Sequence, residues 1–276
     1  MRIYKTKQGF YLEKNGQYFL LKNKNWDELI NDDQLLEKLN EVSVSEKPVE
    51  VDMMATGVLA PIGSQEVWAC GVTYLRSKIG RQEESKETGG GDFYARVYEA
   101  ERPEVFFKSS AFRVVGPNEE VRIRKDSAWD VPEPELTLVV TSSGKIVGYT
   151  IGNDMSSRSI EGENPLYLPQ AKTYDGSAAI GPCIFLAEQP LDTNTLIRLE
   201  INRNLQNVFK GEIAINQMKR SPEELVSFVF RECSFPVGCF IMTGTGIVPG
   251  NDFTLKQGDQ IKISIDAIGE LVNVVG

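Results

Sequence analysis

From Val58 onward the sequence is a series of short apolar runs separated by glycine and proline. Runs of this kind, bounded by turn residues, are typical of short β-strands. Two helical patterns interrupt the series, over 76–101 and 225–231. The first contains three consecutive glycines, and the second follows a capping box that begins at Ser221. Since the tail over 260–275 alternates like a hairpin, we expect an α+β protein that is mainly β.

The first 60 residues have a different pattern. Two apolar runs flank Asn15-Gly16, a strong hairpin signal because both turn positions require positive φ. A polar stretch over 43–48 has the composition of a linker. Between them lies a helical pattern, interrupted at 31–33, whose apolar face consists of Trp26, Leu29, Ile30, Leu35, Leu36 and Leu39. These features predict a small N-terminal α/β domain over 1–60 and a larger domain over 61–276.

The composition excludes several classes of function. The chain has 276 residues, enough to bury a full core, and a net charge of -9. Nucleic acids and anionic membranes require clustered Lys and Arg, so neither is an expected partner. No run approaches about 18 apolar residues, so no membrane span is expected. The four cysteines form no CxxC pair and the first residues have no apolar signal core, so we expect a reduced, cytoplasmic protein.

The sequence contains no histidine. This absence excludes Ser-His-Asp and Cys-His nucleophilic sites, imidazole bases and histidine-bound zinc or iron. A catalytic chain of this composition must work with carboxylates, lysine, tyrosine, hydroxyl groups or a metal bound through oxygen.

Two carboxylates stand at the start of an apolar run, Trp129-Asp-Val-Pro-Glu-Pro-Glu-Leu-Thr-Leu-Val-Val140. In a strand, residues two apart point to the same face, about 6.5 Å apart. Glu133 and Glu135 are therefore directed to one place. If that place is inside the domain, two like charges are unfavourable unless a cation lies between them. The alternative is a solvated edge strand, for which Pro132 and Pro134 are typical markers.

A third carboxylate, Asp154, ends the β-type run Gly148-Tyr-Thr-Ile-Gly-Asn-Asp154. A simple Asx turn would also explain this residue. Together with Glu133 and Glu135 it would make a site with oxygen ligands only, suited to Mg²⁺ or Mn²⁺. Zinc is a poorer match, because the chain has no histidine to bind it.

Two further segments carry candidate binding groups. Glu163–Lys172 ends in a lysine that can pair with a substrate carboxylate or, if desolvated, act as a base or form a Schiff base. A solvated surface lysine is the alternative. The loop Met242–Gly250 offers glycine-exposed amides and the hydroxyls of Thr243 and Thr245, which suit a carboxylate. It lacks the lysine of a nucleotide P-loop, and an ordinary loop between strands is its alternative.

In series, these motifs resemble the fumarylacetoacetate hydrolase superfamily. The resemblance covers about Pro61 to Gly276 and implies a twisted β-roll of mixed sheets, of the β-sandwich type. It also implies a divalent ion, Mg²⁺ or else Mn²⁺ or Ca²⁺, bound by Glu133, Glu135 and Asp154. The matching motifs, in the family's order, are Gly71-x-x-Tyr74, Phe106-Phe-Lys108, Glu133-x-Glu135-Leu136, Gly148-Tyr-Thr-x-x-Asn153-Asp154, Lys172-x-x-Asp175, Gly181-Pro182 and Thr243-Gly-Thr245.

One position departs from the family pattern. Where family hydrolases have a histidine that helps to activate water, this chain has Ser77. The segments 100–108, 127–136 and 163–172 instead resemble the branch that converts 2-keto-3-deoxy-D-arabinonate to 2,5-dioxopentanoate by loss of water. The resemblance implies a metal-dependent hydro-lyase of pentose catabolism that acts on a small 2-keto acid and assembles as a homodimer or homotetramer.

Such a reaction needs no histidine. A 2-keto acid can chelate the ion through a carboxylate oxygen and the C2 carbonyl, and a metal-stabilised enolate then permits loss of the C4 hydroxyl. We assign Lys172 to the substrate's oxygens or to proton transfer, and Thr245 or its loop to the carboxylate. The proton donor to the leaving hydroxyl is left open among Ser77, Glu101, Glu104 and Glu163. Further candidate substrate contacts are Tyr74, Lys108, Arg158, Tyr167, Gln170 and Thr243.

Two alternatives to a dehydratase stay open. One is another superfamily activity on a 2-keto acid, namely C–C hydrolysis, decarboxylation or isomerisation, although the missing histidine disfavours hydrolysis of acylpyruvates. The other is a non-catalytic sugar-acid binding protein, which the complete set of carboxylates and lysine disfavours.

Overall fold

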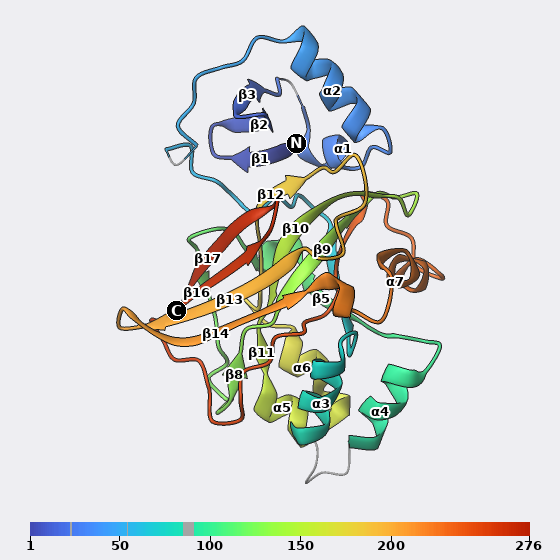
Figure 1. Ribbon diagram of the computed structural model, residues 1–276, viewed down its shortest axis with the longest axis vertical. Coiled ribbons are helices and arrows are strands. Elements are labelled where there is room, and N and C mark those ends of the chain that lie inside the picture. The colour runs from blue at the N-terminus through green and yellow to red at the C-terminus, as the bar shows by residue number, and fades with distance from the viewer. Residues whose placement is uncertain (23, 54, 85–90) are drawn as a thin grey trace.

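The computed structural model describes residues 1–22, 24–53, 55–84 and 91–276. Two mixed sheets pack against each other, and most helices gather at one end of the larger sheet (Figure 1). The larger sheet has the strand order β3-β2-β1-β12-β10-β9-β15-β4-β5, with β6 paired to β12. Its strands are β1 (Arg2–Thr6), β2 (Gly9–Lys14), β3 (Gln17–Leu20), β4 (Glu66–Gly71), β5 (Glu104–Ser110), β6 (Val114–Val115), β9 (Pro134–Val140), β10 (Ile146–Asp154), β12 (Ala178–Phe185) and β15 (Cys239–Met242).

The second sheet has the order β14-β13-β16-β17-β7, and β8 and β11 form a separate short pair. The strands are β7 (Glu120–Val121), β8 (Asp130–Val131), β11 (Ser156–Ser157), β13 (Leu196–Arg203), β14 (Gln206–Ala214), β16 (Gln260–Ile265) and β17 (Gly269–Val275). Leu136 and Ile151 from the larger sheet pack with Ile197, Leu199 and Ile263 from the second, so a hydrophobic core lies between the sheets. The expectations of a mainly β fold and of a hairpin at the tail are confirmed.

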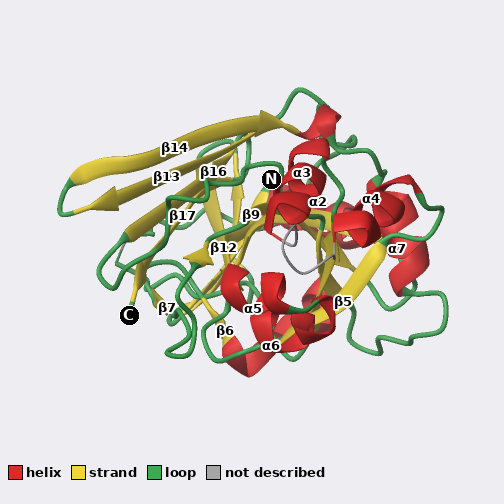
Figure 2. Ribbon diagram, turned by 90° about the horizontal axis from the view of Figure 1, so that it is seen from below, coloured by secondary structure: helices red, strands yellow, loops and turns green. Residues whose placement is uncertain are grey.

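Short helices lie between the strands, and α3 to α6 gather at one end of the sheets (Figure 2). Ser221 Oγ accepts a hydrogen bond from the Glu224 amide at 3.1 Å, which confirms the cap of the last helix. Gly89 and Gly90, in the expected interruption of 76–101, lie outside the described residues. The helices are α1 (Trp26–Ile30), α2 (Leu35–Ser45), α3 (Leu75–Glu84), α4 (Gly91–Glu99), α5 (Arg158–Glu163), α6 (Leu168–Lys172), α7 (Pro222–Val229) and the 3-10 turns η1 (Ala111–Arg113), η2 (Pro165–Tyr167) and η3 (Ile215–Gln217).

The N-terminal segment joins the larger sheet. Asn15 and Gly16 have φ of 53° and 77°, and β2 and β3 form the expected hairpin around them. Strand β1 pairs with β12, which extends the sheet across the expected domain boundary. Ile3 and Leu12 share one hydrophobic cluster with Val139 of β9. The division at residue 60 stays a prediction.

No helix of the described residues is long and apolar enough to cross a membrane. Helix α7 packs its apolar face, through Leu225 and Val229, on the side of the larger sheet that carries Leu138 and Val140. The opposite side of β9 carries Val139 and leads to the polar end of the strand at Glu133 and Glu135.

Candidate metal centre

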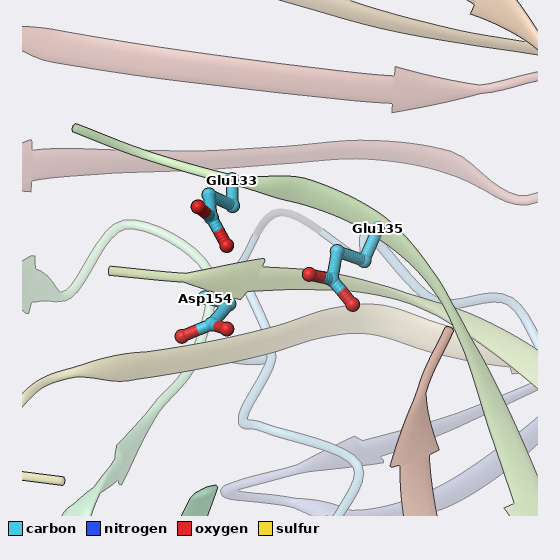
Figure 3. Close-up of side chains that lie close together, drawn as sticks. All are labelled: Glu133, Glu135 and Asp154. Atoms are coloured by element: carbon cyan, nitrogen blue, oxygen red, sulfur yellow. The ribbon is translucent and has the colours of Figure 1, made fainter. Parts of the chain in front are cut away.

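Three carboxylates meet where β9 begins and β10 ends (Figure 3). Pro134 lies opposite Asn153, and the Asp154 amide donates to the Glu133 carbonyl at 2.9 Å, so the two strand ends are locked together. One oxygen from each of Glu133, Glu135 and Asp154 lies within 4.8 Å of the others.

The carboxylates point into the protein, not into solvent. Glu133, Glu135 and Asp154 are only 4%, 2% and 1% exposed. Strand β9 lies between β10 and β15, and every residue of β9 is buried. The alternative of a solvated edge strand is therefore wrong, and so is that of a simple turn at Asp154, which belongs to β10.

The charges of Glu133, Glu135 and Asp154, called the trio below, favour the binding of a cation. Burial raises the pKa of Glu133, and burial together with the charges of Asp154 and Glu133 raises the pKa of Glu135 well above its ordinary value. For Asp154, Lys108 and Lys172 outweigh the effect of burial and lower the pKa. Three buried carboxylates with hard oxygen donors fit Mg²⁺ or Mn²⁺, whose charge would relieve their mutual repulsion.

Lys172 lies directly beside the three carboxylates. Its Nζ donates to Glu133 Oε2 at 2.6 Å, to Asp154 Oδ2 at 3.0 Å and to Ser156 Oγ at 2.6 Å. Burial lowers the pKa of Lys172, but the charges of Asp154 and Glu133 outweigh it and raise the pKa above its ordinary value. Lys172 is fully buried as an ammonium group, and the alternative of a solvated lysine is wrong.

Two more cations form ion pairs with carboxylates of the trio. Lys108 Nζ lies 2.6 Å from Asp154 Oδ1 and donates to the backbone carbonyls of Met155, at 3.0 Å, and Lys172. Arg158 Nη2 donates to Glu133 Oε1 at 2.7 Å. We expected Lys108 and Arg158 to contact substrate; in this structure both bind carboxylates of the trio.

Sequence reasoning missed a buried ion pair, Arg81 and Glu161. Glu161 is 1% exposed and Arg81 is 4% exposed, and the two side chains are in direct contact. Lys172 Nζ lies 3.7 Å from Glu161 Oε1, and Arg158 Nε lies 4.0 Å from Glu161 Oε2. The spacing of three residues between Arg158 and Glu161 was the available signal, because it puts both on one helix face.

Glu104 lies on the same side of the sheet as the trio. Residues two apart in β5 share a face, and Lys172 Nζ lies 5.7 Å from the ring centre of Phe106, so Glu104 faces the site as well. Glu104 lies opposite Gly71 of β4, where a Cβ atom would be 1.7 Å from Glu104 Oε2. That oxygen is buried and has no hydrogen-bond partner among the described residues. Burial is the main cause that raises the pKa of Glu104.

Several predicted hydroxyl groups are used by the fold. Ser77 Oγ donates to the Tyr74 carbonyl at 2.7 Å at the start of α3. Thr243 Oγ1 donates to the Leu136 carbonyl at 2.9 Å, and Thr245 Oγ1 to the Ile247 carbonyl at 3.3 Å. Within this loop, the Gly244 amide donates to Glu135 Oε2 at 2.6 Å and so holds one member of the trio. Roles of these side chains toward a substrate stay predictions.

Three predicted residues lie apart from the buried cluster. Glu163, at the end of α5, is exposed, as are Tyr167 and Gln170 on the following turns. Tyr74, in contrast, is fully buried, and its ring is close to Gly246 of the 243–247 loop. Catalytic or binding roles for Glu163, Tyr167 and Gln170 are not supported by their positions and stay predictions.

The whole cluster, as far as the structure describes it, has five carboxylates and four cations. With every group ionised it carries one net negative charge. A divalent ion would make that charge positive, which favours binding of an anionic 2-keto acid. The carboxylates are Glu104, Glu133, Glu135, Asp154 and Glu161, and the cations are Arg81, Lys108, Arg158 and Lys172.

The chain is similar to dehydratases over most of its length. It is 46% identical over 244 residues to a probable 2-keto-3-deoxyxylonate dehydratase of Haloferax volcanii, covering 88% of this chain and 82% of that protein. It is 42% identical over 220 residues to a 2-dehydro-3-deoxy-D-arabinonate dehydratase of Saccharolobus solfataricus, with coverages of 79% and 74%. A solved structure of 2-keto-3-deoxy-D-arabinonate dehydratase, complexed with magnesium and 2,5-dioxopentanoate, matches with a TM-score of 0.84, 34% identity and coverages of 100% and 98%.

The family model described as fumarylacetoacetate (FAA) hydrolase, C-terminal, matches residues 78–276. This range contains all three carboxylates of the proposed metal centre, together with Lys172 and Glu161. It confirms the resemblance that the ordered motifs indicated. The chain belongs to the fumarylacetoacetate hydrolase family.

Proposed function

We propose that this chain is a Mg²⁺-dependent hydro-lyase that removes water from 2-keto-3-deoxy-D-arabinonate and gives 2,5-dioxopentanoate. The observation that carries the proposal is the buried trio of Glu133, Glu135 and Asp154 with Lys172 bound beside it. Relatives at 46% and 42% identity are dehydratases of 2-keto-3-deoxy sugar acids by name. The solved relative at 34% identity holds magnesium and the proposed product.

The names of the two relatives differ in the sugar acid, but this difference is small in chemical terms. Xylonate and arabinonate of one series differ in configuration at C2 and C3. A keto group at C2 and a methylene at C3 remove both stereocentres, so with the same C4 configuration the two 2-keto-3-deoxy acids are one compound. The stereochemical choice left to the site is the configuration at C4.

Overall, one proton from C3 and the hydroxyl from C4 leave as one molecule of water, and tautomerisation of the resulting C3–C4 alkene gives the aldehyde at C5. Glu133, Glu135 and Asp154 would hold the ion. When bound, Mg²⁺ supplies a Lewis acid that draws electron density from the C2 carbonyl and makes the C3 protons acidic. Lys172, kept as an ammonium group by Glu133 and Asp154, orients the oxygens of the substrate. Only the neutral amine forms a Schiff base, so the raised pKa of Lys172 disfavours the covalent alternative.

Glu104 fits the role of the acid that protonates the leaving C4 hydroxyl. Its Oε2 is buried without a partner among the described residues, and burial raises its pKa, so that it retains a proton more readily than an exposed glutamate. The other candidates fit less well. Ser77 is bound to a backbone carbonyl, and Glu101 and Glu163 are exposed.

The test is to incubate purified protein with 2-keto-3-deoxy-D-arabinonate and follow formation of 2,5-dioxopentanoate with and without a chelator. We expect turnover that stops when metal is removed and returns with added Mg²⁺. Activity that survives complete metal removal contradicts the role of the ion. Trapping of substrate on Lys172 by borohydride would instead support the Schiff base. Turnover of acylpyruvates alone would replace the dehydratase with a C–C hydrolase, and binding without consumption would favour a binding protein.

We also propose a setting for the enzyme, in the cytoplasm and in pentose catabolism, as a homodimer or homotetramer. All four cysteines are free thiols, and Cys70, Cys183 and Cys239 are buried, which suits a reducing compartment. The oligomeric state rests on the family resemblance and can be measured by light scattering of the purified protein.

A further inference from the structure

Glu161 is a buried carboxylate that the proposed reaction does not use. It is 1% exposed and lies on α5, where it contacts Lys172 and Arg158, two cations that also bind Glu133. Lys172 Nζ is 3.7 Å from Glu161 and 2.6 Å from Glu133. Arg158 is 4.0 Å from Glu161 through Nε and 2.7 Å from Glu133 through Nη2. Each cation is therefore held between a carboxylate of the trio and Glu161.

Arg81 links this arrangement to the neighbouring helices. It comes from α3, contacts the Glu161 carboxylate on α5, and has its guanidinium carbon 5.5 Å from the ring centre of Tyr94 on α4. Both Arg81 and Tyr94 are buried, at 4% and 6% exposure. Glu161 thus contacts three cations, and the positive charge of Arg81 weakens its attraction for Lys172 and Arg158.

The position of Lys172 and Arg158 depends on a balance of charges. Glu133 and Glu161 both attract the two cations, so a stronger contact with one carboxylate weakens the contact with the other. Both oxygens of Glu133 and both of Asp154 already contact a cation, so Mg²⁺ would share its ligand oxygens with Lys172, Arg158 or Lys108. A stronger pull from Glu161 frees these oxygens for the ion, and a weaker pull leaves Lys172 on them.

We propose that Glu161 and Arg81 are a pair of positioning residues that sets how tightly Lys172 and Arg158 bind the metal carboxylates. Glu161 draws the two cations back, and Arg81 limits that pull. Among the contacts that the structure describes, the pair has none to the trio, and in the proposed reaction it does not reach the reacting carbons of the substrate. It therefore controls Mg²⁺ affinity and the aim of Lys172 indirectly. The kinetic part of this inference rests on the proposed dehydratase function, whereas the part on Mg²⁺ affinity does not.

Changing the two residues should have opposite effects on Mg²⁺ affinity. In Glu161→Gln the cations lose their rear partner and compete with the ion, so Mg²⁺ binds about 10- to 100-fold more weakly, the range known for residues behind metal ligands. In Arg81→Met, Glu161 acts on Lys172 and Arg158 alone, so Mg²⁺ binds more tightly. A pair with a merely structural role would weaken Mg²⁺ binding in both variants.

Turnover separates positioning from simple charge effects. At saturating Mg²⁺ both variants should lose at least about 10-fold in kcat, because Lys172 is displaced in one direction or the other. Arg81→Lys keeps the cation and should recover most of the loss. If Arg81→Met binds Mg²⁺ more tightly but keeps the wild-type kcat, the pair does not position Lys172.

The experiment is calorimetric titration of Mg²⁺ into full-length, metal-free protein without substrate, followed by kinetics at saturating Mg²⁺. Glu99→Gln is the matched control. Glu99, the last residue of α4, also pairs with cations of other segments, Lys78 of α3 at 3.5 Å and Lys219 at 3.2 Å, but its side chain is 67% exposed. This variant should leave Mg²⁺ affinity and kcat unchanged.

Several outcomes contradict the inference. It is overturned if Glu161→Gln leaves Mg²⁺ affinity and kcat at wild-type values, or if both variants weaken Mg²⁺ binding to a similar extent. If Arg81→Met does not fold, Glu161→Gln and Arg81→Lys still decide, since the first must weaken Mg²⁺ binding and the second must not. Wild-type protein that binds Mg²⁺ but leaves 2-keto-3-deoxy-D-arabinonate intact sinks the proposed function, while the Mg²⁺ titrations still test the pair.

Discussion

The metal centre is built from two regions that hold their charges in different ways. Glu135 and Asp154 belong to two adjacent strands in the interior of the larger sheet, and Glu133 directly precedes β9, where its carbonyl accepts a hydrogen bond from the Asp154 amide. Arg81, Glu161 and Lys172 come from the short helices α3, α5 and α6, and α5 contacts both of the other two (Figure 1). The strands supply a rigid set of ligands, and the helices supply adjustable counter-charges. We expect changes in the first region to remove the metal and changes in the second to alter its surroundings.

Glu135→Gln tests the strand region and should have the largest effect. Loss of one charged ligand should weaken Mg²⁺ binding by more than about 100-fold, beyond the range for residues behind the ligands, and abolish turnover at physiological Mg²⁺. The metal-free fold should keep its stability, because burial and the neighbouring charges already raise the pKa of Glu135 and disfavour its ionised form. Calorimetry and urea unfolding measure the two quantities. Normal Mg²⁺ affinity would show that Glu135 is not a ligand.

Variants of two glutamates of α5 test the helix region through their effect on the stability of the protein. Glu161 is buried in an ion pair, whereas Glu163, which the sequence suggested as a catalytic residue, is exposed. Glu161→Gln removes a buried charge that Arg81, Lys172 and Arg158 all contact, so the free energy of unfolding should fall by about 3–5 kcal/mol. Glu163→Gln should change it by less than about 0.5 kcal/mol. Urea unfolding of both variants checks this, and equal effects would remove the contrast between them.

The same difference explains what the sequence could predict. Strand alternation alone aimed Glu133 and Glu135 at one place, and the hairpin at Asn15-Gly16 and the cap at Ser221 followed from local rules. The ordered motifs added the fold, the family and Lys172. The ion pair of Arg81 and Glu161 was not predicted, because it joins α3 to α5 and no local sequence pattern indicates a contact between these helices. Glu163 was named because it begins the motif Glu163–Lys172, whereas Glu161 precedes that motif and no helix was expected to bury it.

Gly71→Ala tests whether Glu104 belongs to the rigid region. A Cβ atom at Gly71 would lie 1.7 Å from Glu104 Oε2, so the carboxyl group must move, which a flexible side chain permits without loss of the fold. Displacement of the proposed acid by about 1 Å should lower kcat about 100-fold. In the Glu104→Gln background, Gly71→Ala should lower kcat little further, because both changes act through the carboxyl group of Glu104. Steady-state kinetics of the three variants measures this, and additive losses would separate Gly71 from Glu104.

Pro134→Ala should have the smallest effect and concerns the rigidity of the strands themselves. Pro134 is buried at the start of β9, between Glu133 and Glu135 and opposite Asn153. Its ring fixes φ where both neighbours are expected to hold the ion. Because a proline that fits its site stabilises by about 0.4–1 kcal/mol, the alanine variant should bind Mg²⁺ about two- to five-fold more weakly if that restriction reaches the ligands. Calorimetry resolves such a change. Unchanged affinity with lower overall stability would mean that Pro134 stiffens the sheet, while the backbone pairing of β9 with β10 alone aims the carboxylates.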